Sequence, residues 1–230
     1  MNKKLKILSL LLALITVISS LTILTACDSA SKLNFELNKD GTGYVCLGFK
    51  EEKTASELEI PAEVKGLPVV EVGFNSFNGN KDLTKVVIPD SVVKIGVSAF
   101  KNCSNIVEIS LPSKLEQIEK TAFYKTAIKE LVIPDNVKNI GESAFEGCEK
   151  LESVSLGSSM ERVQDFAFSG CTALSQLDLG KGLKCIKKCA FENCTSLTEI
   201  TLPESLEMIY GWAFDGCDNV TKFTFKNTVG

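Results

Sequence analysis

The chain has 230 residues with 25 basic and 29 acidic side chains, a formal net charge of −4 at pH 7, nine cysteines and no histidine. The lack of histidine excludes Ser-His-Asp and Cys-His nucleophilic sites and His-based zinc hydrolase sites. The acidic balance argues against a nucleic-acid partner, because phosphate binding requires clustered Lys and Arg.

Residues 1–26 are predicted to be a secretory signal peptide. They begin with a basic stretch, continue as an apolar run over residues 7–24 that only Ser and Thr interrupt, and end in small residues. An uncleaved membrane helix is the alternative, because the run is nearly long enough to span a bilayer. Loss of this segment removes three lysines and no acid, so the formal charge moves from −4 to −7.

The residues at the end of the signal favour a lipid anchor. Leu24-Thr25-Ala26-Cys27 resembles the bacterial lipobox. This resemblance implies that Cys27 carries a diacylglycerol and becomes the new N-terminus, and two acyl chains are enough for stable anchoring in a membrane. Residues 27–33 would then form a short tether.

Residues 34–71 are predicted to form an N-terminal cap over the first open coil of a solenoid, which repeat proteins need for solubility. Asp40-Gly41-Thr42-Gly43 is a good hairpin turn between two short apolar stretches. Leu58-Glu59-Ile60-Pro61 has the same pattern as the end of each repeat strand farther along the chain.

Residues 72–230 are predicted to be a solenoid of about seven coils, where a coil is one repeat of about 23 residues. A repeat of this length is typical of a stack of similar supersecondary units. Each repeat contains a phenylalanine that follows a small residue, Ala in six coils and Ser76 in the first, so we expect these rings to point inward and form a spine. The rings follow one another at spacings of 23, 23, 22, 23, 23 and 23 residues: Phe77, Phe100, Phe123, Phe145, Phe168, Phe191 and Phe214.

The rest of the repeat predicts mainly β structure, with short turns or 3-10 segments between strands. Apolar residues follow the frame Leu-x-x-Val-x-Leu, as at Leu83, Val86 and Ile88, and their final spacing of two is strand periodicity. The residue two places after each ring is Gly or Asn, which tolerate a positive φ, in every coil but one. Lys125 is the exception. It lies in the coil that has lost a residue, and we expect its turn to be rebuilt.

Five cysteines stand three residues after a ring: Cys103, Cys148, Cys171, Cys194 and Cys217. We expect one inward column of free thiols, because strands lie about 4.8 Å apart and a disulfide needs Cβ atoms about 3.5–4.5 Å apart. Cys185 and Cys189 lie off this column, and a local disulfide between them stays open. With Cys194 they lack the paired spacing and the fourth ligand of a zinc site, so we expect no metal and no cofactor.

The repeat as a whole is similar to that of a known family. The stretch from Ile95 to Cys103 fits the string Ile-Gly-x-x-Ala-Phe-x-x-Cys, and residues 209–217 fit it with the Gly shifted by one. This string resembles the leucine-rich repeat of BspA-type bacterial surface proteins, over roughly residues 72–225. The resemblance implies a leucine-rich-repeat solenoid, surface display, adhesion and protein binding. No catalytic residue belongs to the motif, so the resemblance implies none here.

The outward positions of the predicted strands form two stripes along the stack. One stripe consists of Val87, Ser110, Val132, Ser155, Asp178, Thr201 and Thr224, and its neighbour of Lys85, Glu108, Glu130, Ser153, Gln176, Glu199 and Lys222. We predict that a partner binds this face around Ser155, Gln176 and Asp178. The alternative for any single residue is an inert, solvated face. The scattered acids, Glu142 among them, are interpreted as solvated and not as the carboxylate pair of a glycosidase.

The sequence therefore predicts a lipid-anchored protein of the bacterial cell surface that presents a β face to a protein or glycan and is not an enzyme. A structural envelope or assembly protein without a soluble ligand is the alternative. A solute-binding lipoprotein is a further one, but it needs two lobes and a cleft, which equal repeats do not provide. Phe223 and Phe225 predict a bare apolar edge on the last strand, which either pairs with a second copy or is covered by further chain.

Overall fold

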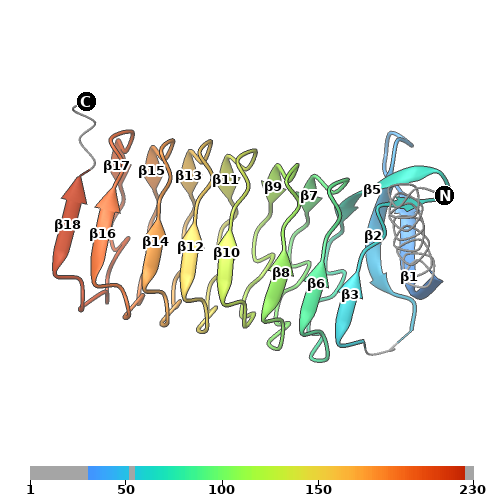
Figure 1. Ribbon diagram of the computed structural model, residues 1–230, viewed down its shortest axis with the longest axis horizontal. Coiled ribbons are helices and arrows are strands. Elements are labelled where there is room, and N and C mark those ends of the chain that lie inside the picture. Colours follow the sequence, from blue (N-terminus) through green and yellow to red (C-terminus); the bar gives the residue numbers. More distant parts are fainter. Residues whose placement is uncertain (1–30, 52–54, 226–230) are drawn as a thin grey trace, which may run out of the picture.

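The chain forms an elongated stack of coils, and this confirms the predicted leucine-rich-repeat-like solenoid of mainly β structure (Figure 1). The computed structural model describes residues 31–51 and 55–225. The predicted signal peptide, residues 1–26, and the predicted lipidation site Cys27 therefore lie outside the described residues. The part of the chain that the structure describes contains eighteen strands, joined mostly by tight turns.

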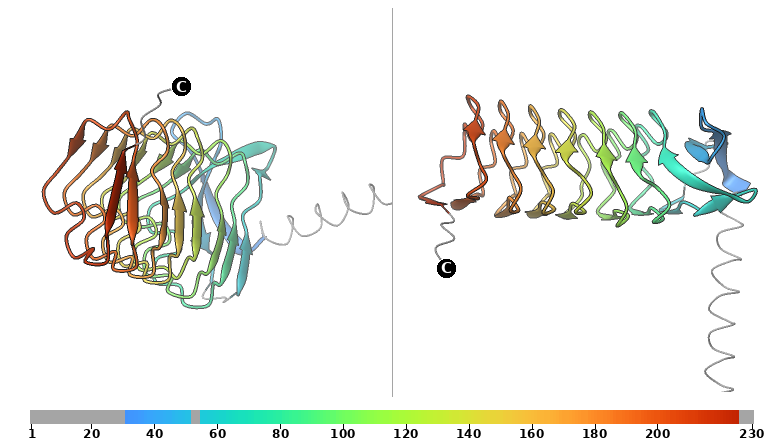
Figure 2. Two further views of the ribbon diagram at one scale, coloured as in Figure 1. Left: turned by 60° about the vertical axis from the view of Figure 1, so that its left-hand side comes forward. Right: turned by 90° about the horizontal axis from the view of Figure 1, so that it is seen from above.

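Each regular coil contributes one strand to what we call the front face and one to what we call the back sheet. The front-face strands are β3 (Glu57–Glu59), β6 (Lys85–Val87), β8 (Glu108–Ser110), β10 (Glu130–Val132), β12 (Ser153–Ser155), β14 (Gln176–Asp178), β16 (Glu199–Leu202) and β18 (Lys222–Phe225). The back-sheet strands are β5 (Leu67–Val72), β7 (Lys94–Ile95), β9 (Gln117–Ile118), β11 (Asn139–Ile140), β13 (Arg162–Val163), β15 (Cys185–Ile186) and β17 (Met208–Ile209). Figure 2 shows the two rows of strands on different sides of the stack.

The back sheet is continuous from β5 to β17, and its neighbouring strands are parallel and one coil apart. Two further strands, β1 (Leu33–Leu37) and β2 (Tyr44–Phe49), form the antiparallel hairpin that its turn sequence predicts, and β2 extends the sheet beside β5. The short β4 (Glu63–Val64) pairs with β5. Strands β3 and β5 already pair in register with the first regular coil, so the stacking begins within residues 34–71.

The seven repeated rings form one stacked column in the core, as predicted. Successive ring centroids lie 5.1–5.4 Å apart, and successive planes are within 4–10° of parallel. An edge-on ring contacts each end of the column. Phe49 lies 5.3 Å from Phe77 at 80°, and Phe223 lies 6.3 Å from Phe214 at 78°. We call this column the ring spine.

Two positions in each coil adopt a positive φ. The position two residues after the ring does so in all seven coils, with φ between 54° and 79°, as predicted for the Gly and Asn residues. Lys125 also keeps this conformation, at 54°, so the prediction that its turn is rebuilt is wrong. The reason is a hydrogen bond between coils. The Lys125 N–H donates to the Glu146 carbonyl at 2.9 Å, and this helps to offset a backbone cost of about 1–2 kcal/mol.

The second positive-φ position lies two residues before each ring, and the sequence analysis did not predict it. Its φ values lie between 53° and 59° even where the residue is large. The residues are Asn75, Ser98, Thr121, Ser143, Phe166, Cys189 and Trp212. The sharp bend places the following Ala against the stack and directs the ring inward.

The five column thiols are buried, and each donates its S–H to the carbonyl oxygen of the ring residue in the preceding coil. The Sγ–O distances are 3.0–3.4 Å, in the pairs Cys103–Phe77, Cys148–Phe123, Cys171–Phe145, Cys194–Phe168 and Cys217–Phe191. Thr126 fills the same column in the short coil and donates its hydroxyl to the Phe123 oxygen at 3.0 Å. The thiols are therefore more than apolar packing groups, because they give buried carbonyls a hydrogen-bond donor. Cys185 and Cys189 are also free thiols.

Stability is expected to fall at alkaline pH because of these thiols. Burial raises the pKa of the Cys148 thiol from 9.0 to about 11. The folded state therefore favours the protonated thiol. The contribution of the Cys148 thiol to the free energy of unfolding is complete below about pH 9. As the pH rises toward 11, about 2 kcal/mol of this contribution is lost. Denaturant unfolding at pH 8 and pH 11 tests this. The Cys148→Ser variant, whose hydroxyl does not ionise in this range, should lose about 2 kcal/mol less than the wild type between these pH values. Equal losses would contradict the prediction.

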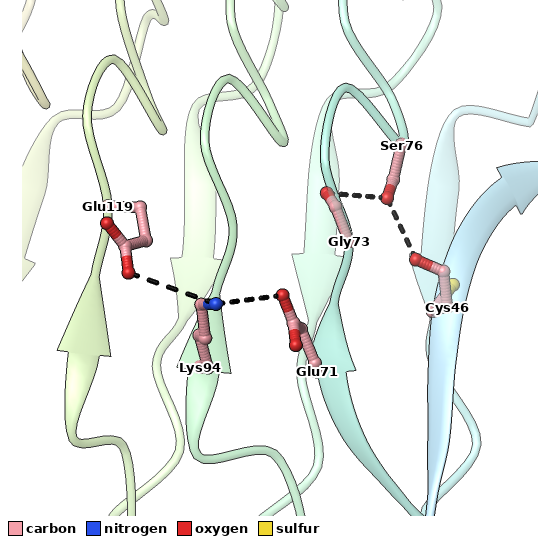
Figure 3. Close-up of polar contacts among 6 residues, drawn as sticks. All are labelled: Cys46, Glu71, Gly73, Ser76, Lys94 and Glu119. Atoms are coloured by element: carbon pink, nitrogen blue, oxygen red, sulfur yellow. Dashed lines mark hydrogen bonds and ion pairs between the residues drawn. The ribbon is translucent and has the colours of Figure 1, made fainter. Parts of the chain in front are cut away.

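The Ser76 side chain joins the N-terminal hairpin to the first coil (Figure 3). The Ser76 hydroxyl lies 2.8 Å from the carbonyl oxygens of Cys46 and Gly73 and can donate to either. Gly48 has φ of +102°, and a Cβ there would overlap the Ser76 carbonyl oxygen. Ser76 thus replaces the usual Ala of the repeat because its hydroxyl connects β2 to the stack.

Candidate functional site

The predicted stripe residues all lie on the front face, and the strand register aligns them within each group of paired strands. Glu130 pairs with Ser153 and Ser153 with Gln176, while Val132 pairs with Ser155 and Ser155 with Asp178. Most of these side chains are exposed, namely Glu108, Ser110, Glu130, Val132, Gln176, Asp178 and Glu199, and Ser155 and Thr201 are half-buried. The stripes thus form a surface of small and charged side chains.

The front face is interrupted, which the sequence analysis did not predict. Its strands fall into three separate groups, β3-β6-β8, β10-β12-β14 and β16-β18. The break between β8 and β10 is visible in Figure 1, while the back sheet runs past it without interruption. The two stripes are therefore not continuous ladders from end to end.

The break between β8 and β10 arises in the 22-residue coil. In this coil the front strand starts seven residues after the ring, from Phe123 to Glu130, and in its neighbour it starts eight residues after, from Phe100 to Glu108. The Lys129 N–H lies 3.4 Å from the Val107 carbonyl oxygen, while the equivalent bonds in the two adjacent coils measure 2.9 and 2.8 Å. The shortened connection therefore draws β10 away from its neighbour.

A groove lies over this break. One part of it has a volume of about 550 Å³ and is lined by residues 85–87 of β6, residues 107–110 at β8, and Lys129 and Glu130. The other part, of about 450 Å³, extends between residues 109–113 and residues 131–135. Ile109 and Ser110 line both parts. We call the two parts together the β8–β10 groove.

The groove has an apolar rim and a mixed-charge border. Val132 is 71% exposed and Val87 is 37% exposed, and Ser110 lies between them in the stripe. Lys85 and Glu108 form an ion pair at 3.6 Å on one border, and Lys129 and Glu130 follow one another on the other. Exposed ion pairs of this kind contribute less than about 1 kcal/mol, so these residues remain available to a partner.

The last coil exposes residues whose counterparts in inner coils are buried. Ile209 is 44% exposed where Ile186 is fully buried, and Phe223 and Phe225 of β18 are 53% and 69% exposed. The predicted apolar edge is therefore present on the described residues.

Several charged side chains in and beside the back sheet pair with one another across coils. Lys94 lies 3.3 Å from Glu71 and 3.9 Å from Glu119, so one ammonium group bridges three coils (Figure 3). Glu142 pairs with Lys120 at 2.7 Å. Among the residues that the structure describes, no group of His, Cys, Asp and Glu could hold a metal ion. Within the same ranges, no helix is long and apolar enough to cross a bilayer.

The sequence contained one signal for the groove, the single spacing of 22 residues among the rings. The sequence analysis used it to predict a rebuilt turn at Lys125. The structure shows that the lost residue changes the chain farther along. In this coil one residue, Ala127, forms the corner that two residues, Ser104 and Asn105, form in the preceding coil. Ala127 is buried, while Ser104 and Asn105 are exposed.

Comparison with known proteins agrees with this architecture. The sequence pattern of the BspA type leucine rich repeat region matches residues 70–171 and 116–230, with six copies. No curated protein matches the chain. Among solved structures, the leucine-rich repeat protein of T. pallidum is 28% identical with a TM-score of 0.58, over 73% of this chain and 89% of that protein.

Two other solved structures are less similar overall. A leucine-rich repeat protein from Bacteroides ovatus is 21% identical with a TM-score of 0.47, over 85% of this chain and 70% of that protein. One from Bacteroides capillosus is 27% identical with a TM-score of 0.46, over 54% of this chain and 94% of that protein. With its repeated rings, its two strands per coil and the matching sequence pattern, this chain belongs to the BspA-type leucine-rich repeat family.

Proposed function

We propose that this protein is a lipid-anchored binding protein of the bacterial cell surface and not an enzyme. The predicted signal peptide and Cys27 would attach it to the membrane, and the solenoid would project from the surface. The observation that carries the proposal is the front face, whose outward side chains are aligned in register across neighbouring coils. Such a repeated, extended surface is typical of solenoids that bind other macromolecules. The partner is a protein or a glycan at the cell surface.

The residues proposed to contact the partner are not equally suited to a test. The Asp178 carboxylate accepts a hydrogen bond from the Gly180 N–H at 3.1 Å, so replacing it would disturb the following turn. Gln176 is exposed on β14 and Ser155 is half-buried on β12, and neither forms the turn. Gln176 is the better choice because Gln117, an exposed Gln on β9 of the back sheet, provides a matched control.

We expect the Gln176→Arg variant to recover at least about tenfold less partner from cell-surface extracts than the wild type, because a large charged side chain on a contact surface blocks close packing. Gln117→Arg should recover as much as the wild type. Both variants should keep their melting temperature, since exposed substitutions change stability by less than about 0.5 kcal/mol. The measurement is a pull-down with the tagged chain from host-cell, matrix and bacterial envelope fractions, quantified by mass spectrometry. Equal recovery by both variants would rule out the front face.

A structural role in the envelope is the second candidate, and the exposed apolar edge at β17 and β18 favours it. An open edge of this kind can pair with a second copy of the chain. In that case the same pull-down recovers only the chain itself and envelope proteins. The recovery is then lost in a Phe225→Lys variant and kept in Gln176→Arg.

A further inference from the structure

We propose that the β8–β10 groove binds an extended peptide segment of a partner protein, with one apolar side chain of that segment between Val87 and Val132 and over Ser110. This inference rests on the proposed binding function of the front face and gives that face a specific contact site. Three properties of the groove support it: its apolar rim, its unpaired strand edges and its slight excess of acidic side chains.

The apolar rim is the first property. The stripe through Ser110 contains two aliphatic residues, Val87 and Val132, and they lie on either side of Ser110 at the groove. Every other member of that stripe is polar. Val132 is the most exposed of the large apolar side chains on the described residues. An apolar side chain placed over the small Ser110 would cover both valines, and the removal of their apolar surface from water favours binding.

The second property is the backbone that the break leaves available. Within the described residues, β8 pairs with β6 and β10 pairs with β12, and the facing sides of β8 and β10 share no strand ladder. Main-chain N–H and C=O groups that no ladder uses can hydrogen-bond to the backbone of an extended segment lying over the break. A lipid chain lacks these groups.

The slight excess of acidic side chains is the third property and disfavours polyanions. Lys85 and Lys129 at the groove are matched by Glu108 and Glu130, and Asp135 adds a further acid. A nucleic acid or an acidic glycan would meet these carboxylates, which oppose its binding. A peptide segment with an apolar anchor and few charges fits the border better.

The walls of the groove are held rigidly from behind. Ile118 and Ile140 pair in the back sheet across the break, and the rings of Phe100 and Phe123, which precede β8 and β10, stack at 5.4 Å. The groove therefore exists before a partner arrives, and little conformational entropy is lost when it binds.

The test uses the full chain, purified in detergent, and random linear peptides displayed on phage as the probe. Enriched peptides are synthesised, and their Kd is measured by fluorescence polarisation for the wild type, Ser110→Arg, Gln176→Arg and the control Gln117→Arg. Gln117→Arg adds the same charged side chain at an exposed position of the back sheet, outside the front face, and the melting temperatures of all variants report correct folding. A Val132→Ser variant removes half of the apolar rim without adding bulk.

We expect the enriched peptides to share an apolar residue. Their Kd should rise at least about tenfold in Ser110→Arg, less than about twofold in Gln117→Arg, and about threefold or more in Val132→Ser. An unchanged Kd in Ser110→Arg, equal losses in Ser110→Arg and Gln117→Arg, or no enriched peptide would each overturn the groove proposal. Weaker binding in Gln176→Arg together with an unchanged Kd in Ser110→Arg would overturn the groove proposal and still support the front face. If the pull-down recovers a saccharide partner and this recovery depends on Gln176, the groove proposal would likewise be overturned and the front face still supported.

Discussion

Replacing Phe145 with Ala is expected to destabilise the protein by about 3–5 kcal/mol. The Phe145 side chain is fully buried in the middle of the ring spine, with stacked rings at 5.1 and 5.2 Å on its two sides. The substitution removes the stacking contacts of Phe145 with both neighbouring rings, and it leaves a cavity that the rigid coils cannot fill. A loss of this size is a large part of the 5–15 kcal/mol that stabilises a typical domain.

The matched control for this variant is Phe74→Ala. Phe74 lies outside the spine and its side chain is 68% exposed, so its removal should change the free energy of unfolding by less than about 0.5 kcal/mol. Urea denaturation followed by circular dichroism measures both variants. A loss below about 1 kcal/mol for Phe145→Ala, or equal losses for the two variants, would show that the spine does not hold the stack together.

The Gly48→Ala variant is expected to lose roughly 3 kcal/mol or more, because two effects act together. The φ of +102° is one that residues with a side chain rarely adopt, and the added Cβ would overlap the Ser76 carbonyl oxygen. Overpacking costs about 1–3 kcal/mol, and a positive φ at a non-glycine residue costs about 1–2 kcal/mol. The strand β2 would have to move away from the first coil, and Phe49 would leave the end of the ring spine.

Gly66→Ala separates the two effects. Gly66 also has a positive φ, of +80°, but a Cβ there would meet open space. We expect it to lose about 1–2 kcal/mol, from the backbone alone. Thermal unfolding gives the stability of both variants, and hydrogen exchange of the amides in β1 and β2 shows whether the hairpin has separated. Equal losses for Gly48→Ala and Gly66→Ala would mean that the contact with Ser76 contributes nothing.

The features that the sequence predicted correctly are those that repeat in every coil. The ring spacing and the small residue before each ring placed Phe100 and Phe168 in the core, and the Leu-x-x-Val-x-Leu frame located the front strands. A repeat imposes the same local conformation and the same neighbours many times. Each of these patterns could therefore be interpreted from one coil and extended to the others.

The second strand of each coil was missed although its residues also repeat. Its one buried residue, such as Ile95, lies three positions after a buried residue of the preceding turn, Val92, and this spacing does not match the strand period of two. The strand is only two residues long and is held by its parallel neighbours. Its existence depends on stacking between coils, which no single coil contains.

By itself, then, the sequence determined the coil length, the inward rings and thiols, and the outward stripes, because each depends on a local pattern with a fixed period. The tertiary structure alone decided that Lys125 keeps its left-handed conformation, that each thiol donates to the coil before it, and that one lost residue opens the β8–β10 groove. These features arise from hydrogen bonds and register between coils, and such contacts are set by the position of neighbouring backbone rather than by the residues of one repeat.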